Sequence, residues 1–128
     1  MLKTVYDTRF FLEHYYSREA AMLRKTKEAI RTVKERFISA IVIHEVYWLT
    51  LTQEGHETAI LRATLLEKDF KVVKVDAEIA RSSAELRHKY KMNMADSIIA
   101  ATALFLKATC LSDDPHFKNV GEIKTTWI

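Results

Sequence analysis

Short β-rich runs alternate with longer helical segments along this chain, and this alternation constrains the fold more than any other feature. It indicates βαβ units with right-handed connections around a central, mostly parallel sheet, so we predict an α/β fold. The predicted strands cover residues 2–6, 37–39, 71–75, 109–111 and 123–127. The predicted helices cover residues 9–15, 18–34, 40–53, 57–68, 76–89 and 93–107, with a one-turn helix at Pro115.

Four residues mark expected boundaries of these elements. Thr8 is expected to cap the first helix, and Asn93 the helix that precedes the fourth strand. Gly55 suits the C-terminal cap of the helix over residues 40–53, and Gly121 suits the turn into the last strand.

Length and composition predict one domain, residues 1–128. The 128 residues include only two glycines and one proline, and no internal repeat is recognisable. The single cysteine, Cys110, is expected to lie buried in the core. We recognise no signal peptide and no apolar stretch long enough to cross a bilayer, so we expect a cytoplasmic protein without a membrane partner.

Several common kinds of catalytic site are not indicated. The five histidines have no zinc-type spacing with one another or with Cys110, although His116 could support a neighbouring ligand. There is no glycine-rich phosphate loop and no nucleophilic serine elbow.

Four acids occupy positions where a carboxylate calls for an explanation. Asp7 and Asp114 follow predicted strands, while Glu45 and Asp96 stand on mostly apolar helices. A carboxylate near a core is costly unless it is hydrogen-bonded, paired or bound to a metal. Four such acids on elements that could converge predict a site for a hard divalent cation, and with it phosphate chemistry.

Each acid also has a local structural explanation. Asp7 could cap the helix that follows it. Asp96 stands three residues after Asn93, as in a variant of the capping box, and Asp114 precedes a proline, as an N-cap residue does. Glu45 has the weakest explanation of this kind, a partly exposed position at a helix edge.

Basic residues concentrate between residues 17 and 36, although the net charge of the chain is only +3. This segment could contact a polyanionic backbone. It could instead form a solvated helix face with ion pairs around Glu28, and the segment taken alone favours this second interpretation.

Four stretches follow one another along the chain: VYDTRFFLEHY, ISAIVIHEV, ADSIIAATAL and LSDDPHF. Together they resemble the PIN-domain family of nucleases, including the VapC toxins of toxin–antitoxin pairs. VYDTRFFLEHY places an aspartate and a threonine after an apolar strand, and ISAIVIHEV places a glutamate after a serine. ADSIIAATAL is the most specific match. In LSDDPHF, Ser112 replaces the usual threonine, while Asp114 and Phe117 are in register.

This resemblance implies a three-layer PIN-like (Rossmann-like) fold with a short central parallel sheet of four to five strands flanked by helices. It also implies a metal-dependent ribonuclease that cuts single-stranded RNA with Mg²⁺ or Mn²⁺. At the matched positions it implies an acidic cluster of Asp7, Glu45, Asp96 and Asp114. Asp7, Asp96 and Asp114 are the expected metal ligands, and Glu45 is a ligand or a water-orienting base.

The resemblance implies supporting residues and partners as well. Thr8 and Ser112 are expected to lend hydroxyl groups to the cluster. Asp113 adds a charge beside Asp114 and leaves open which of the two faces the metal, although the spacing to Phe117 favours Asp114. If the substrate is RNA, the basic segment could bind it, and the expected RNA contacts are Arg24, Lys25 and Lys27. The resemblance further implies a homodimer and a cognate antitoxin.

Three alternatives remain open from the sequence. The first is a housekeeping RNA-processing PIN nuclease without an antitoxin. The second is a catalytically silent PIN scaffold that binds RNA or protein. The third is a phospho-receiver domain, in which Asp76 would accept the phosphoryl group.

Overall fold

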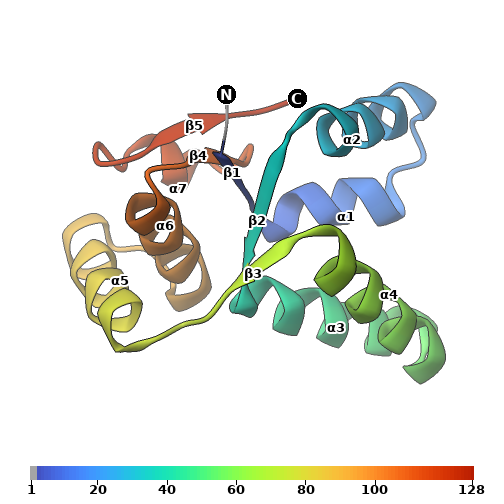
Figure 1. Ribbon diagram of the computed structural model, residues 1–128, viewed down its shortest axis with the longest axis horizontal. Helices are drawn as coiled ribbons and strands as arrows, with labels where there is room; N and C mark the ends of the chain where they lie inside the picture. The colour runs from blue at the N-terminus through green and yellow to red at the C-terminus, as the bar shows by residue number, and fades with distance from the viewer. Residues whose placement is uncertain (1–2) are drawn as a thin grey trace.

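Five parallel strands form one sheet within residues 3–128, the part of the chain that this computed structural model describes (Figure 1). The predicted strand position at Leu2 lies outside these residues. The strand order is β3-β2-β1-β4-β5, and every neighbouring pair is parallel. The strands are β1 Lys3–Tyr6, β2 Glu35–Ser39, β3 Lys71–Val73, β4 Thr109–Leu111 and β5 Lys124–Thr126.

Helices cover both faces of this sheet and give three layers. In Figure 1 the α1–α4 group and the α5–α6 pair lie on opposite sides of the strands. The helices are α1 Thr8–Tyr16, α2 Ala20–Thr32, α3 Ala40–Glu54, α4 His56–Asp69, α5 Ala77–Tyr90, α6 Met94–Leu106 and α7 Pro115–Lys118. The predicted α/β architecture with four to five parallel strands is therefore confirmed.

The strand order reverses between β1 and β4, which are neighbours in the sheet although about a hundred residues separate them in sequence. The backbone N–H of Asp7 donates to the carbonyl oxygen of Leu111 at 3.2 Å, so this pairing continues just past the end of β1. In open α/β sheets, ligands bind outside the carboxyl ends of the strands at such a reversal. The fold therefore marks the ends of β1 and β4 as the place for a site.

The core forms where apolar side chains of the sheet meet helices on both faces. On one face, Tyr6, Phe10, Phe11 and Phe70 pack with ring centroids 4.9 to 6.2 Å apart. The Tyr6 hydroxyl donates to the carbonyl oxygen of Ala29 at 2.7 Å, which ties β1 to α2. On the other face, α6 is buried over residues 97–103, as expected for a helix that is apolar on nearly every side.

One predicted cap is wrong, and it concerns a site residue. The N-cap of α1 is Asp7, not Thr8. The backbone of Asp7 is extended and its carboxylate accepts a hydrogen bond from the backbone N–H of Thr8 at 2.8 Å. Thr8 is already the first residue of the helix, and its hydroxyl is used elsewhere.

Several predicted boundaries also shift by a few residues. β3 ends at Val73 rather than at residue 75, because its partner β2 ends at Ser39, opposite Val73, and offers no further backbone groups. β2 begins two residues earlier than predicted, and β5 is shorter at both ends. Asn93 and Gly55 cap helices as expected, since the Asn93 side chain accepts from the Asp96 N–H and the Gly55 N–H bonds the end of α3.

Asp76 has a structural role that leaves little support for the phospho-receiver alternative. Its carboxylate accepts from the backbone N–H of Ile79 at 2.9 Å and caps α5. It also follows β3, which lies at the edge of the sheet and away from the strand reversal. Within the described chain, no helix is long and apolar enough to cross a membrane.

We predict that Gly55→Ala destabilises the protein by about 1–3 kcal/mol. Gly55 joins α3 to α4 with φ of 92° and ψ of 178°, a conformation that a residue with a Cβ adopts only under strain. An added Cβ would meet no atom within 4 Å, so the cost comes from the backbone alone. Urea unfolding of both proteins measures the difference.

Gly121→Ala is the matched control. Its Cβ would lie 3.7 Å from the Tyr90 hydroxyl oxygen, an ordinary contact, and its φ is not in the positive region. We expect this variant to unfold with nearly wild-type free energy. Equal losses in the two variants would contradict the assignment of strain to Gly55.

Candidate active site

The carboxylate of Asp7 lies at the strand reversal and is only 2% exposed. One oxygen accepts from the Thr8 backbone N–H, and the other accepts from the Ser112 hydroxyl at 2.6 Å. Ser112 directly follows β4, so this contact joins residues 105 positions apart. Asp7 is therefore both a helix cap and a member of a polar cluster, and the two interpretations of this residue are compatible.

Glu45 approaches the same place from α3. It stands in the second turn of that helix and is partly buried. The Thr8 hydroxyl donates to Glu45 Oε1 at 2.5 Å, so the residue after Asp7 orients this second carboxylate. The helix itself is fixed by Ser39, whose side chain accepts from the Ile41 N–H as the N-cap.

Asp96 enters from the first turn of α6 in a capping box. Its N–H donates to Asn93 Oδ1 at 2.8 Å, and Asn93 Nδ2 donates to Asp96 Oδ2 at 3.0 Å. Its other oxygen accepts no hydrogen bond from any residue that the structure describes. The cap holds the carboxylate in one orientation and leaves that oxygen for a ligand.

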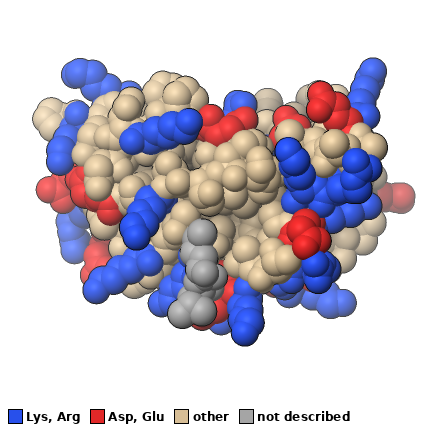
Figure 2. Space-filling model, turned by 90° about the horizontal axis from the view of Figure 1, so that it is seen from above, with Lys and Arg blue, Asp and Glu red and all other residues tan. Residues whose placement is uncertain are grey.

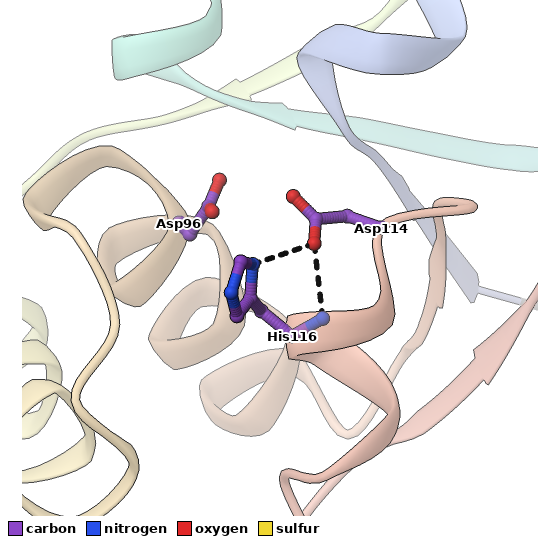
Figure 3. Close-up of side chains that lie close together, drawn as sticks. All are labelled: Asp96, Asp114 and His116. Carbon is purple, nitrogen blue, oxygen red and sulfur yellow. Dashed lines mark hydrogen bonds and ion pairs between the residues drawn. The ribbon is translucent and has the colours of Figure 1, made fainter.

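Asp114 completes the group from the loop before α7. Figure 3 shows the carboxylates of Asp96 and Asp114 facing one another, with the His116 imidazole beside them. Asp114 Oδ1 accepts from the His116 backbone N–H at 2.9 Å and lies 2.8 Å from His116 Nδ1. One possible ligand atom from each of Asp96, Asp114 and His116 lies within 4.8 Å of the others.

The neighbouring acid, Asp113, points to a different partner. Its carboxylate pairs with the Arg9 guanidinium, with Nε 2.5 Å from Oδ1 and Nη2 3.3 Å from Oδ2. Asp114, and not Asp113, is therefore the member of the adjacent pair that faces Asp96.

The charges of the four acids act on one another. The pKa of Asp7 is raised from 3.8 to about 7, mainly by burial and also by the charges of Asp96 and Glu45, against the hydrogen bonds from Ser112 and Thr8. Burial also raises the pKa of Asp96, and the charges of Asp114 and Glu45 add to this rise. Like charges at close range disfavour one another's ionised forms, so this cluster should attract a cation strongly.

The donor set fits a hard divalent cation. Mg²⁺ and Mn²⁺ prefer carboxylate oxygens and usually retain several waters, and Asp96 and Asp114 present carboxylates across a partly open space. His116 offers an imidazole nitrogen at the same place, whereas Asp7 lies deeper. Zinc sites are usually built from cysteine and histidine, and this set contains no thiolate.

The structure places the basic segment apart from the cluster. Arg24, Lys25 and Lys27 are exposed on α2, which packs mainly on α1 and leads into the start of β2. Figure 2 shows Lys and Arg side chains on both sides of the face seen from above, including the end where α2 lies. The Arg31 side chain pairs with Glu28, as the solvated-face interpretation expects. The RNA contacts of Arg24, Lys25 and Lys27 remain a prediction.

Sequence reasoning missed the role of Arg9 and gave His116 only a supporting part. Arg9 stands two residues after Asp7, and a cation so close to a candidate metal ligand is a usable signal. Its partner is 104 positions away, so the pairing itself could not be read from local sequence.

We predict that Asp7→Asn stabilises the metal-free protein at pH 8. Between pH 4 and 7 the folded chain holds a proton on Asp7 that the unfolded chain has lost, so the stability of the wild type falls as pH rises through this range. The rise in pKa corresponds to at most about 4 kcal/mol. Urea unfolding in EDTA at pH 5 and pH 8 measures this slope.

The Asn variant should show a flatter dependence on pH, while Glu67→Gln, an exposed carboxylate change on α4, should keep the wild-type slope. Identical slopes for the wild type and Asp7→Asn would show that Asp7 ionises without cost.

Solved structures share the fold of this chain, whereas a search of curated proteins found no match. Solved structures with the same fold include VapBC2 of Rickettsia felis bound to a promoter DNA fragment (TM-score 0.80, 14% identity, 99% of each chain). A second is a toxin–antitoxin complex from Klebsiella pneumoniae (TM-score 0.77, 22% identity, 98% of this chain and 100% of that one). A third is VapC20 of Mycobacterium tuberculosis, a sarcin-ricin loop cleaving toxin (TM-score 0.78, 18% identity, 95% of this chain and 99% of that one).

The family itself follows from sequence. The model of the PIN domain family matches residues 4–123, a span that contains Asp7, Glu45, Asp96 and Asp114. The chain therefore belongs to the PIN domain family.

Proposed function

We propose that this protein is a metal-dependent endoribonuclease that hydrolyses single-stranded RNA. The observation that supports the proposal is that Asp96, Asp114 and His116 each offer a ligand atom within 4.8 Å of the others at the reversal of a PIN-family sheet, where the charges of Asp7 and Glu45 act on the same group. These acids come from four separate segments of the chain. If each acid served only its own helix, the four would have no reason to lie close together.

Asp96 and Asp114 would hold the cation, with Asp7 as the deeper ligand and His116 close enough to join them. When bound, Mg²⁺ or Mn²⁺ would neutralise charge on the phosphate and make a water more acidic. The cation would also relieve the repulsion that raises the pKa values of Asp7 and Asp96.

The other polar residues fix these carboxylates in place. Thr8 orients Glu45, Ser112 orients Asp7 and Asn93 orients Asp96, each through a hydrogen bond of 3.0 Å or less. Glu45 has one oxygen that accepts from Thr8, and its second oxygen would bind the cation or orient the attacking water. Such pre-orientation lowers the cost of assembling the reacting groups.

We further propose that the nuclease is the toxin of a type II toxin–antitoxin pair. The solved structures with this fold include VapBC and other toxin–antitoxin complexes. The chain also exposes large apolar side chains on the α3–α4 pair, among them Trp48 at 61% and Leu61 at 58%, which supports a protein partner. A homodimer acting in the cytoplasm on RNA belongs to the same proposal.

The direct test is cleavage of a labelled single-stranded RNA. We expect cleavage with Mg²⁺ or Mn²⁺, leaving a 5′-phosphate and a 3′-hydroxyl, and none with EDTA. Asp96→Asn and Asp7→Asn should each lower the rate by about 100-fold or more, because each removes a charge that holds the cation.

Glu67→Gln serves as the control, since this exposed carboxylate lies on α4 outside the cluster. Full activity of Asp7→Asn and Asp96→Asn in folded protein would overturn the site. Full wild-type activity in EDTA would overturn the metal dependence.

The partner has its own test. A small gene beside this one that encodes a DNA-binding protein would indicate an antitoxin, and we expect its product to co-purify with this chain and to inhibit cleavage. Leu61→Glu should weaken the complex without loss of fold, because it places a charge on the exposed apolar surface. An active nuclease with no such neighbour would favour the housekeeping alternative.

A further inference from the structure

Arg9 lies at the rim of the acidic cluster, in the first turn of α1 and two residues after Asp7. Its guanidinium forms a two-point pair with Asp113, in which Nε and Nη2 each meet one carboxylate oxygen. The Arg9 side chain is 50% exposed, and that of Asp113 is 32% exposed. The pair therefore faces solvent beside the cluster.

The charge of Arg9 reaches the proposed metal ligands as well as its direct partner. The Arg9 guanidinium donates to Asp113, which directly precedes Asp114 in the chain, and the charges of Asp114 and Asp7 also act on it. The guanidinium is thus close to acids that follow both β1 and β4. An RNA phosphate that approached Asp7 and Asp114 would also approach Arg9.

The positive charge of Arg9 would reduce the repulsion between the acidic cluster and an RNA backbone. Four carboxylates repel an RNA backbone, and a bound divalent cation offsets only part of that charge. Two other arginines pair with acids elsewhere, Arg31 with Glu28 and Arg62 with Glu54. Arg24, Lys25 and Lys27 are on α2, away from the acids.

The chemistry of the pair suits a phosphate. A guanidinium binds carboxylate and phosphate through the same fork of parallel N–H donors. Asp113 occupies Nε and Nη2, while Nη1 has no hydrogen-bond partner among residues 3–128. Because the pair is partly exposed, solvent screening weakens it, and a phosphate could displace or share the Asp113 contact.

We propose that Arg9 binds a backbone phosphate of the RNA beside the cleavage site, and that Asp113 pairs with its guanidinium only while no RNA is bound. This inference rests on the proposed ribonuclease function. It assigns the RNA contact nearest the reaction to a residue in the first turn of α1, in addition to any contact made by α2.

The competing explanation is that the pair only ties the β1–α1 junction to the β4–α7 loop. The two explanations predict different results for the two partners. A phosphate ligand makes Arg9→Gln weaken RNA binding, whereas Asp113→Asn, which frees the guanidinium and removes a negative charge, leaves binding equal or tighter. A simple clamp makes both variants weaken binding alike.

The test measures binding of a fluorescent single-stranded RNA by anisotropy, in the Asp96→Asn background so that the RNA stays intact. We expect Arg9→Gln to weaken binding by about tenfold or more and to lower the salt slope by about one. Arg9→Lys should recover part of the affinity, because it keeps the charge and loses the fork. Arg81→Gln, an exposed change on α5, is the matched control and should behave like the background protein.

The outcomes separate this inference from the proposed function. If the background protein binds RNA and Arg9→Gln binds equally well, the Arg9 assignment is overturned while the nuclease proposal stands. Equal weakening by Arg9→Gln and Asp113→Asn also overturns it, in favour of the clamp. If the Asp96→Asn protein does not bind single-stranded RNA and the wild type does not cleave it, both proposals fail.

Discussion

The buried carboxylate of Asp7 is the group on which the rest of the site depends. Asp7 directly follows β1, caps α1 and accepts a hydrogen bond from Ser112 just past β4, so it joins the two strands at which the sheet order reverses. A carboxylate that is 2% exposed costs free energy when it is charged, and its pKa of about 7 reflects that cost. The protein keeps this group although two hydrogen bonds do not fully compensate its charge.

The other acids increase that cost and do not relieve it. Glu45 is held by Thr8, and Asp96 by its capping residue, in positions from which both raise the pKa of Asp7. Hydrogen bonds orient these groups without neutralising them. A bound divalent cation would turn the same arrangement from destabilising to stabilising, because it binds the folded cluster and not the dispersed acids of the unfolded chain. The clustered charges lower the stability of the metal-free protein, and such a loss of stability is consistent with a functional site.

Most of the fold was predictable because local rules decide it. Short β-rich runs that alternate with helical segments specify the parallel sheet. Asn93 caps a helix through its side-chain oxygen, and Gly55 does so because it can adopt a positive φ. The four acids could be selected because each stands at a strand end or on an apolar helix. Contacts between segments that lie far apart in the sequence could not be predicted from the sequence. The Arg9–Asp113 pair spans 104 positions, and the length of β3 depends on where β2 stops.

Anomalous scattering from crystals of the protein soaked in Mn²⁺ would show whether these acids bind a cation. We expect one strong peak within coordination distance of Asp96 and Asp114, on the side facing Asp7, and loss of that peak in Asp96→Asn crystals that keep the same fold. A well-ordered cluster with no peak at millimolar Mn²⁺, or a peak bound only by acids elsewhere on the surface, would contradict it.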